Sequence, residues 1–149
     1  MKVKTNNEKE TKEVAKKIAK LVNKNNKRAT VITLSGDLGS GKTTFTKGFA
    51  DYFNISEITS PTFVIMKKYE LDGFDFNNFY HVDCYRLEEK STLDEINFNE
   101  VLSDANNIVL IEWAERLKQI PERSINLKFK VLEGKKRLIT IPNSLGLKK

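Results

Sequence analysis

Residues 30–44 read Thr-Val-Ile-Thr-Leu-Ser-Gly-Asp-Leu-Gly-Ser-Gly-Lys-Thr-Thr, and this stretch decides the fold. The β-branched run 30–35 predicts a strand, and the amphipathic segment 42–52 predicts a helix. Between them, residues 36–43 match the phosphate-loop (Walker A) pattern G-x-x-x-x-G-K-[ST] at every fixed position. The motif therefore has the strand–turn–helix setting that phosphate binding requires.

The residue types of this loop explain why it suits a nucleoside triphosphate. Glycines let successive backbone N–H groups point into one anion-sized hollow, and the following helix adds its unpaired N–H groups. We predict that Lys42 reaches the β- and γ-phosphates and is solvated when phosphate is absent. We also predict that the Thr43 hydroxyl ligates Mg²⁺ and that Thr44 contacts the α-phosphate. The alternative is a glycine-rich turn that binds nothing. The predicted nucleotide contacts in the loop are Asp37, Leu38, Gly39, Ser40, Gly41, Lys42, Thr43 and Thr44.

Hydrophobic periodicity supplies the other elements. The predicted elements are a helix over 7–24, strands over 63–70 and 78–85 paired as an antiparallel hairpin, one or two short helices within 91–103, a strand over 107–112, a short helix around 114–119, and paired strands over 125–131 and 136–141. Together they predict one α/β domain over residues 1–149. We expect a three-layer fold like that of P-loop NTPases, whose mixed sheet has a parallel centre and antiparallel flanking strands.

Two helices carry apolar stripes that we expect to be buried. In the first helix the stripe is Val14, Ile18, Leu21 and Val22, and Thr5 with Glu8 has the spacing of a capping box. In the helix after the loop the stripe is Phe45, Phe49 and Tyr52.

Composition narrows the class of protein. Of 149 residues 39% are hydrophobic, and no run of about 18 apolar residues could cross a membrane. The charged start does not resemble a secretion signal, and the single cysteine, Cys84, cannot form an internal disulfide. We therefore predict a soluble cytoplasmic domain.

Charge is distributed unevenly along the chain. Residues 1–30 hold 10 Lys/Arg against 3 Asp/Glu, residues 31–121 hold 8 against 15, and residues 122–149 hold 8 against 2. The basic ends either are solvated faces or contact an acidic partner or tRNA.

Two carboxylates qualify as partners of the loop. Glu112 closes the apolar run 107–112, so we assign it to Mg²⁺, directly or through water. Asp83 follows a half-polar strand, which indicates an edge or cleft face, and we assign it to the γ-phosphate side as a residue that orients water or supports the metal. His81 alternates with Asp83 and should share its face, whereas Cys84 should point into the core.

The segment Ser60-Pro61-Thr62-Phe63 places a hydroxyl on either side of a proline. It is either a switch loop that senses the γ-phosphate or an ordinary turn. No Asn-Lys-x-Asp is present, so the guanine-reading motif of GTPases is missing.

These motifs, in this order and spacing, resemble those of the bacterial TsaE (YjeE) family, the small P-loop ATPases of tRNA threonylcarbamoyladenosine biosynthesis. The resemblance runs from about Thr11 to about Ile141. Its anchors are the segment 35–45, Ser-Pro-Thr-Phe at 60–63, His-Val-Asp-Cys-Tyr-Arg-Leu at 81–87 and Ile-Glu-Trp at 111–113. The loop is generic, whereas the other three anchors are specific.

The resemblance implies cofactors, site residues and partners. It implies ATP or ADP with Mg²⁺, the metal ligands Thr43 and Glu112, and Asp83 as an acid required for hydrolysis alongside the catalytic Lys42. It places Thr11 and Arg137 near the adenine. A switch or partner surface is implied at Ser60, Thr62, Arg86 and Trp113.

The implied partners are TsaB-like and TsaD-like proteins, which transfer the threonylcarbamoyl group to adenosine beside the anticodon, and ATP hydrolysis supports cycling of their complex. Two alternatives stay open: a small-molecule kinase with Asp83 as base, and a non-catalytic, nucleotide-gated binding module.

Overall fold

The computed structural model describes residues 1–58, 66–86 and 97–147. Within these ranges no helix is long and apolar enough to cross a membrane. The elements, in chain order, are β1 (Lys2–Thr5), α1 (Glu8–Leu21), β2 (Thr30–Ser35), α2 (Lys42–Tyr52), β3 (Met66–Glu70), β4 (Asn78–Asp83), α3 (Phe98–Ser103), β5 (Asn107–Glu112), the 3₁₀ helix η2 (Ala114–Arg116), β6 (Ile125–Val131), β7 (Arg137–Thr140) and the 3₁₀ helix η3 (Asn143–Leu145).

The strands form one mixed sheet in the order β1-β7-β6-β2-β5-β4-β3. β1 pairs with β7, β7 with β6, and β3 with β4 in antiparallel fashion, while β4 and β5 are parallel. The predicted α/β class, with a parallel centre and antiparallel flanking strands, is confirmed. Because β4 lies between β5 and β3, the edge-strand alternative for Asp83 is wrong, and the cleft-face alternative stays a prediction.

The chain groups into two compact units. The first holds the described residues of 1–22, 34–59 and 126–149, and the second holds those of 23–33 and 60–125. Strand β2 passes from the second unit into the first between Thr33 and Leu34.

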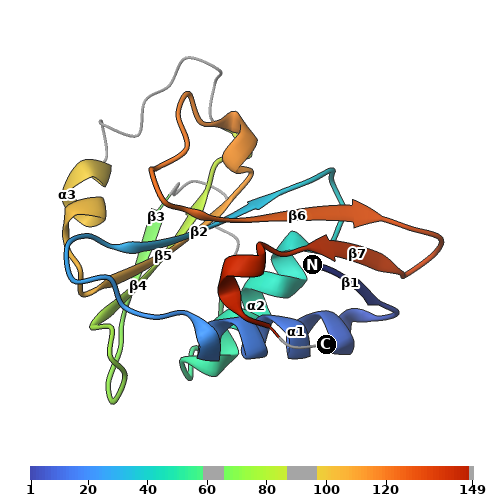
Figure 1. The fold of residues 1–149 in the computed structure, drawn as a ribbon, viewed down its shortest axis with the longest axis horizontal. Coiled ribbons are helices and arrows are strands. Elements are labelled where there is room, and N and C mark those ends of the chain that lie inside the picture. Colours follow the sequence, from blue (N-terminus) through green and yellow to red (C-terminus); the bar gives the residue numbers. More distant parts are fainter. Residues whose placement is uncertain (59–65, 87–96, 148–149) are drawn as a thin grey trace. The chain divides into compact units, whose positions relative to one another are not determined.

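In the first unit, α1 and α2 lie beside the strands β1, β7 and β6 (Figure 1), and the buried residues of this unit include several aromatic side chains. Phe45 on α2 packs edge-on against Phe129 of β6, with ring centroids 5.3 Å apart, and also contacts Phe49. Phe45 and Phe49 are fully buried, as the stripe predicts, whereas Tyr52 is half-buried.

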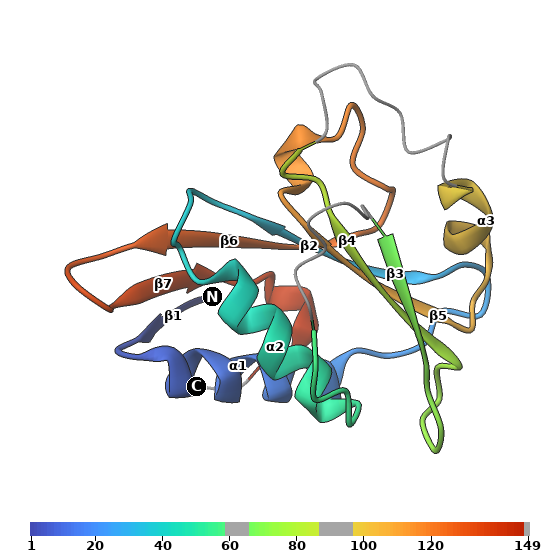
Figure 2. The ribbon, with the colours of Figure 1, turned by 180° about the vertical axis from the view of Figure 1, so that it is seen from behind.

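The second unit contains the β3–β4 hairpin and the parallel strand β5 (Figure 2). The hairpin pairs as predicted, and β5 has the predicted bounds. β4 ends at Asp83, two residues before the predicted end, and residues 63–65 of the first predicted strand lie outside the described residues. α3 falls within the predicted helical range, and the remainder of that range, 91–96, lies outside the described residues. The core of this unit includes Val31, Val82, Val109, Ile111 and Phe98.

Strand β1 was not predicted. Its sequence, Lys-Val-Lys-Thr, is short and carries two charges, so it has little intrinsic strand signal. It forms because Val3 pairs with Ile139 in β7. Pairing with β7 therefore stabilises β1, and this pairing cannot be read from the periodicity of the sequence.

Helix α1 differs from the prediction in its cap and its buried face. Asn7, not Thr5, is the N-cap, and its side chain accepts the N–H of Glu10 at 2.9 Å. Ile18 is buried as predicted, but Leu21 is 38% exposed and Val14 is half-buried. Small residues account for the difference, because the buried positions in α1 are Thr11, Ala15, Ile18 and Ala19.

Gly48 explains why α1 and α2 pack so closely. A Cβ built on Gly48 would lie 2.5 Å from the Cα of Lys12 and 2.7 Å from its carbonyl oxygen. Both atoms belong to the α1 backbone, so neither can move aside without moving the helix.

Gly48→Ala should lower the free energy of unfolding by about 1–3 kcal/mol, because the added methyl group overpacks the contact with Lys12. Helix propensity alone predicts the opposite sign, a gain of about 1 kcal/mol. Urea unfolding followed by circular dichroism measures the difference. Lys47→Ala, an exposed change in the same helix, is the control and should be nearly neutral. Unchanged or raised stability of Gly48→Ala would contradict the close-packing argument.

Candidate functional site

The phosphate loop follows the end of β2 at Ser35 and is shaped by glycines. Gly36, Gly39 and Gly41 have φ of 143°, 74° and 99°, values that side-chain-bearing residues rarely adopt. At Gly36 a Cβ would lie 2.4 Å from the carbonyl oxygen of Phe129, so only glycine fits beside β6 there. The loop backbone is therefore fixed by its sequence.

Helix α2 begins directly after the loop, with Gly41 as its N-cap. Gly41 has a left-handed conformation, and no side chain caps the helix. Uncapped N–H groups and the positive end of the helix dipole at one glycine turn form an anion-binding arrangement. Around it Asp37, Gly39 and Thr43 are exposed, Leu38 is 74% exposed and Thr44 is half-buried.

Lys42 is buried, which corrects the expectation that its side chain is solvated. It is 5% exposed. Its ammonium donates to the carbonyl oxygens of Gly36 and Asp37, the latter at 2.8 Å, and to the Ser40 hydroxyl at 3.3 Å. The curled loop turns its carbonyl groups toward the start of α2, so a cation at position 42 finds ready acceptors within the loop itself.

Thr11 and Arg137, both predicted from the family resemblance, lie beside the loop. A Cβ on Gly41 would be 3.5 Å from Cγ of Arg137 and 4.0 Å from Cγ2 of Thr11. The Thr11 hydroxyl is 2.8 Å from that of Thr5, and Arg137 donates to the carbonyl oxygens of Gly134 and Lys136. The first unit thus brings the loop, α1 and β7 together at Gly41.

The predicted acids end two neighbouring strands of the second unit. In the parallel β4–β5 pair, Asp83 is in register with Glu112. The Cys84 N–H donates to the Glu112 carbonyl oxygen at 3.0 Å, and the Asp83 side chain accepts the N–H of Tyr85 at 3.0 Å. Asp83 is half-buried, whereas Glu112 is 2% exposed. The structure therefore places Asp83 and Glu112 side by side at the carboxyl ends of β4 and β5.

His81 is a residue of this edge that the sequence reasoning left without a role. It is 1% exposed, and its Nε2 lies 2.9 Å from Oε2 of Glu112. Among the described residues Oε1 of Glu112 and Nδ1 of His81 have no hydrogen-bond partner. The pair results from the parallel register, which places His81 opposite Leu110, two residues before Glu112. The sequence holds no signal for that register, so it could not have revealed the pair.

An aromatic cluster follows the two acids. Trp113 has φ 57° and ψ 43°, and its ring centroid lies 4.9 Å from that of Tyr85. The guanidinium carbon of Arg116 lies 5.8 Å from each ring centroid, within cation–π range. Arg86 is exposed. The other residues of the predicted switch or partner surface, Ser60 and Thr62, lie outside the described residues.

Cys84 is in the core, as predicted, with no exposed surface. Burial, and secondarily the charges of Asp83 and Glu115, raise the pKa of its thiol from 9.0 to about 12. Its neutral form is therefore strongly favoured in the folded chain.

The described residues contain no group of three or more His, Cys, Asp and Glu side chains that could hold a metal ion by themselves. In the first unit the Thr43 hydroxyl, and in the second unit the Glu112 carboxylate, are each a hard oxygen donor. Oxygen donors of this kind suit Mg²⁺, which commonly binds one or two protein ligands together with phosphate oxygens and water.

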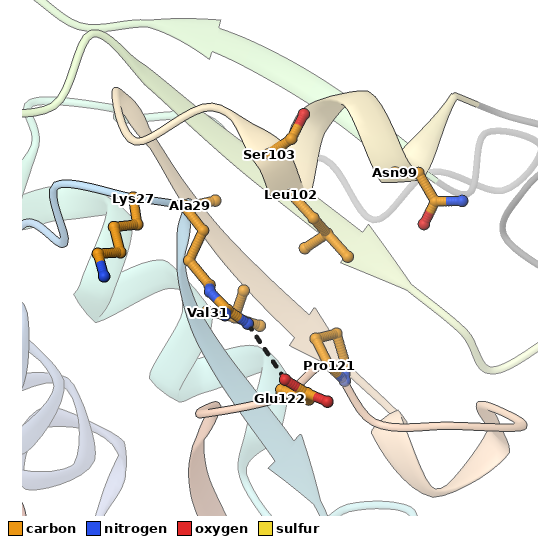
Figure 3. A pocket seen from close by; sticks show the side chains of 9 residues that line it. Lys27, Ala29, Val31, Asn99, Leu102, Ser103, Pro121 and Glu122 are labelled. Carbon is orange, nitrogen blue, oxygen red and sulfur yellow. Dashed lines mark ion pairs between the residues drawn. The ribbon is translucent and has the colours of Figure 1, made fainter.

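A groove of about 380 Å³ lies elsewhere in the second unit (Figure 3). Ala29, Val31, Leu102 and Pro121 give it an apolar lining, and Lys27 lies at its side. Arg28 and Glu122, 3.6 Å apart, form an exposed ion pair of little energetic weight. None of the residues that line this groove belongs to the predicted site.

Comparison with known proteins assigns the family. The family described as "Threonylcarbamoyl adenosine biosynthesis protein TsaE" matches residues 5–139. The chain belongs to the TsaE family. This confirms the resemblance drawn from the sequence motifs.

Individual TsaE proteins are similar over most of the chain. The relative from Rickettsia bellii is 38% identical over 141 residues, which cover 93% of this chain and 92% of the relative. The relative from Bacillus subtilis is 39% identical over 142 residues, which cover 94% and 84%. Both are named tRNA threonylcarbamoyladenosine biosynthesis protein TsaE. A crystal structure of Bacillus subtilis YdiB has a TM-score of 0.68 and 34% identity, covering 98% of this chain and 88% of that one.

We expect the Cys84 thiol of the native TsaE-family chain to react with a disulfide reagent at pH 8 far more slowly than in the urea-unfolded chain. The raised pKa reduces the thiolate fraction roughly 1000-fold, and burial blocks access as well. The neutral thiol's contribution to stability is complete below pH 9 and is lost as the pH rises toward about 12. Absorbance of the released thiol follows the reaction. Equal rates for native and unfolded chain would show that Cys84 is accessible.

Proposed function

We propose that this chain takes part in tRNA threonylcarbamoyladenosine biosynthesis as its ATP-binding and ATP-hydrolysing subunit. The observation that carries the proposal is the loop at 36–43, with three glycines at positive φ ahead of the uncapped start of α2, in a TsaE-family chain. We infer that the loop N–H groups bind the nucleotide phosphates. A cytoplasmic location follows from a role in tRNA modification.

Lys42 is assigned to the β- and γ-phosphates. Its ammonium donates to three oxygen atoms of the loop, the carbonyl oxygens of Gly36 and Asp37 and the Ser40 hydroxyl. Phosphate oxygens can replace those acceptors, because ammonium–phosphate hydrogen bonds are charge-assisted. Thr11 and Arg137, which lie beside Gly41, are assigned to the adenine side.

We assign Mg²⁺ to Thr43 and Glu112. The fit rests on Glu112, a buried carboxylate whose Oε1 lacks a hydrogen bond among the described residues. An unpaired buried carboxylate oxygen is costly, and a cation or a metal-bound water would satisfy it. The ion, when bound, would neutralise the charge that develops on the phosphates during hydrolysis.

Asp83 is assigned to hydrolysis. Its side chain is half-buried, and the Tyr85 N–H holds one of its carboxylate oxygens. A carboxylate anchored in this way can orient a water molecule toward the γ-phosphate or support the metal ligands.

The partners proposed are TsaB-like and TsaD-like proteins, and hydrolysis supports the cycling of their complex. The exposed Arg86 and the Tyr85–Trp113–Arg116 cluster suit a protein surface, because Trp, Tyr and Arg are enriched where partners bind tightly. The basic end segments, 1–30 and 122–149, are available for an acidic partner or tRNA.

Lys42→Ala should weaken ATP binding about 100-fold, because it removes charge-assisted bonds worth about 1.5–3 kcal/mol. Calorimetric titration with a non-hydrolysable ATP analogue measures the affinity. Lys47→Ala removes an exposed lysine of the same helix and is the matched control. Because Lys42 also ties the loop carbonyls together, its variant is checked by thermal unfolding. Full ATP affinity in a folded Lys42→Ala variant would contradict the nucleotide-binding proposal.

Phosphate release should be slow for the isolated chain and faster when TsaB-like and TsaD-like partners are added. A group supplied in trans to the γ-phosphate can be worth ~10³–10⁵ in rate. Asp83→Ala should bind ATP normally yet hydrolyse it roughly 100-fold more slowly, with and without partners.

The same assay separates the alternatives. A phosphorylated small molecule in place of free phosphate would favour a kinase. Partner binding that depends on ATP but not on hydrolysis would favour a nucleotide-gated module. A rate that partners leave unchanged would exclude complex-gated hydrolysis.

A further inference from the structure

Glu112 is assigned to Mg²⁺ above, but its contact with His81 has no role in the function proposed so far. Both side chains are almost completely buried, at 1% and 3% exposure, and Nε2 of His81 lies 2.9 Å from Oε2 of Glu112. They project from adjacent parallel strands, β4 and β5. Burying a carboxylate beside an imidazole carries a desolvation penalty, which the contact between them has to offset.

The direction of the hydrogen bond follows from the chemistry of the two groups. An ionised carboxylate only accepts hydrogen bonds. Beside an ionised Glu112, His81 would carry its proton on Nε2 and donate it to Oε2. Among the described residues the other ring nitrogen, Nδ1, has no partner, so no second contact competes for the orientation of the ring.

Glu112 is consequently held at its main chain and at one side-chain oxygen. The Cys84 N–H donates to its carbonyl oxygen at 3.0 Å, and the imidazole takes Oε2. Only Oε1 remains without a hydrogen bond among the described residues. The hydrogen bond on Oε2 and the enclosure of the side chain together restrict rotation of the carboxylate, and so they restrict the direction in which Oε1 points.

We propose that His81 is a positioning residue, whose Nε2–H holds Oε2 of Glu112 so that Oε1 is presented to Mg²⁺. The inference rests on the proposed assignment of Mg²⁺ to Glu112. Hydrogen bonds to metal-ligating carboxylates orient the ligand in advance, and their loss typically lowers metal affinity 10–100-fold. His81 itself contacts neither the metal nor the nucleotide.

Two substitutions at His81 and one control test the proposal. His81→Leu removes the donor, whereas His81→Gln retains an N–H at the position of Nε2. Asn78→Ala is the matched control, because Asn78 donates to Asn107 at 3.0 Å between the same two strands at their opposite end. Calorimetry measures ADP affinity as a function of Mg²⁺ concentration, and again in EDTA.

His81→Leu should raise the Mg²⁺ concentration for the half-maximal effect by about 10–100-fold while ADP affinity in EDTA stays within about twofold. In His81→Gln the half-maximal Mg²⁺ concentration should return most of the way to the wild-type value. Asn78→Ala should change neither this concentration nor the ADP affinity in EDTA. Unaltered Mg²⁺ dependence in a folded His81→Leu variant would overturn the inference. So would an equal rise, in His81→Leu and His81→Gln, of the Mg²⁺ concentration that gives the half-maximal effect. A wild-type chain that binds ADP without any Mg²⁺ dependence would overturn the metal assignment as well, whereas absence of ADP binding would refute the proposed function.

A second measurement does not depend on a folded variant at His81. His81 is the only histidine in the chain, so a tag-free ¹⁵N-labelled sample gives one imidazole whose signals need no assignment. We expect a proton on Nε2, with a resonance that shifts in Glu112→Gln and not in Asn78→Ala. An imidazole protonated on Nδ1 alone would overturn the inference.

Discussion

The absence of a side chain at two glycines sets the position of the phosphate loop and its helix. Gly36 lets the end of β2 approach the Phe129 carbonyl, and Gly48 lets α2 rest on the backbone of Lys12. One contact fixes the start of the loop against β6, and the other fixes the helix that follows against α1. Lys42, whose ammonium donates to the loop carbonyl oxygens, lies between these two glycines in the sequence. The loop geometry is thus a result of packing in the first unit as well as of its own sequence.

The carboxyl edge of β4 and β5 follows a different physical rule. There the parallel register brings Asp83 level with Glu112, and burial makes the two acids unlike. Asp83 keeps contact with solvent and accepts a main-chain N–H, whereas Glu112 is enclosed and paired with His81. Two carboxylates on adjacent strands can therefore have different chemical roles, because one is enclosed and the other keeps contact with solvent.

Local sequence signals predicted the centre of this protein better than its margins. β2, α2 and β5 have the bounds that apolar runs and the glycine motif indicate, because each is specified by its own residues. β1 was missed because its pairing with β7 creates it, and the α1 cap was misplaced because Thr5 belongs to that strand. Lys42 was expected in solvent, since a motif gives residue types but not the direction of loop carbonyls. The partner of Glu112 was missed for a similar reason, because the strand register that aligns β4 with β5 is a tertiary property.

Trp113, the only tryptophan, gives the chain an internal optical probe. Its left-handed backbone turns the chain directly after Glu112, and its indole lies against Tyr85, whose N–H is bound to Asp83. Trp113 is thus joined to Glu112 by one peptide bond, and it is connected to Asp83 through Tyr85. Fluorescence emission from Trp113 should consequently respond to rearrangement of either carboxylate. Movement at the carboxyl ends of β4 and β5 can then be followed in real time without an added label.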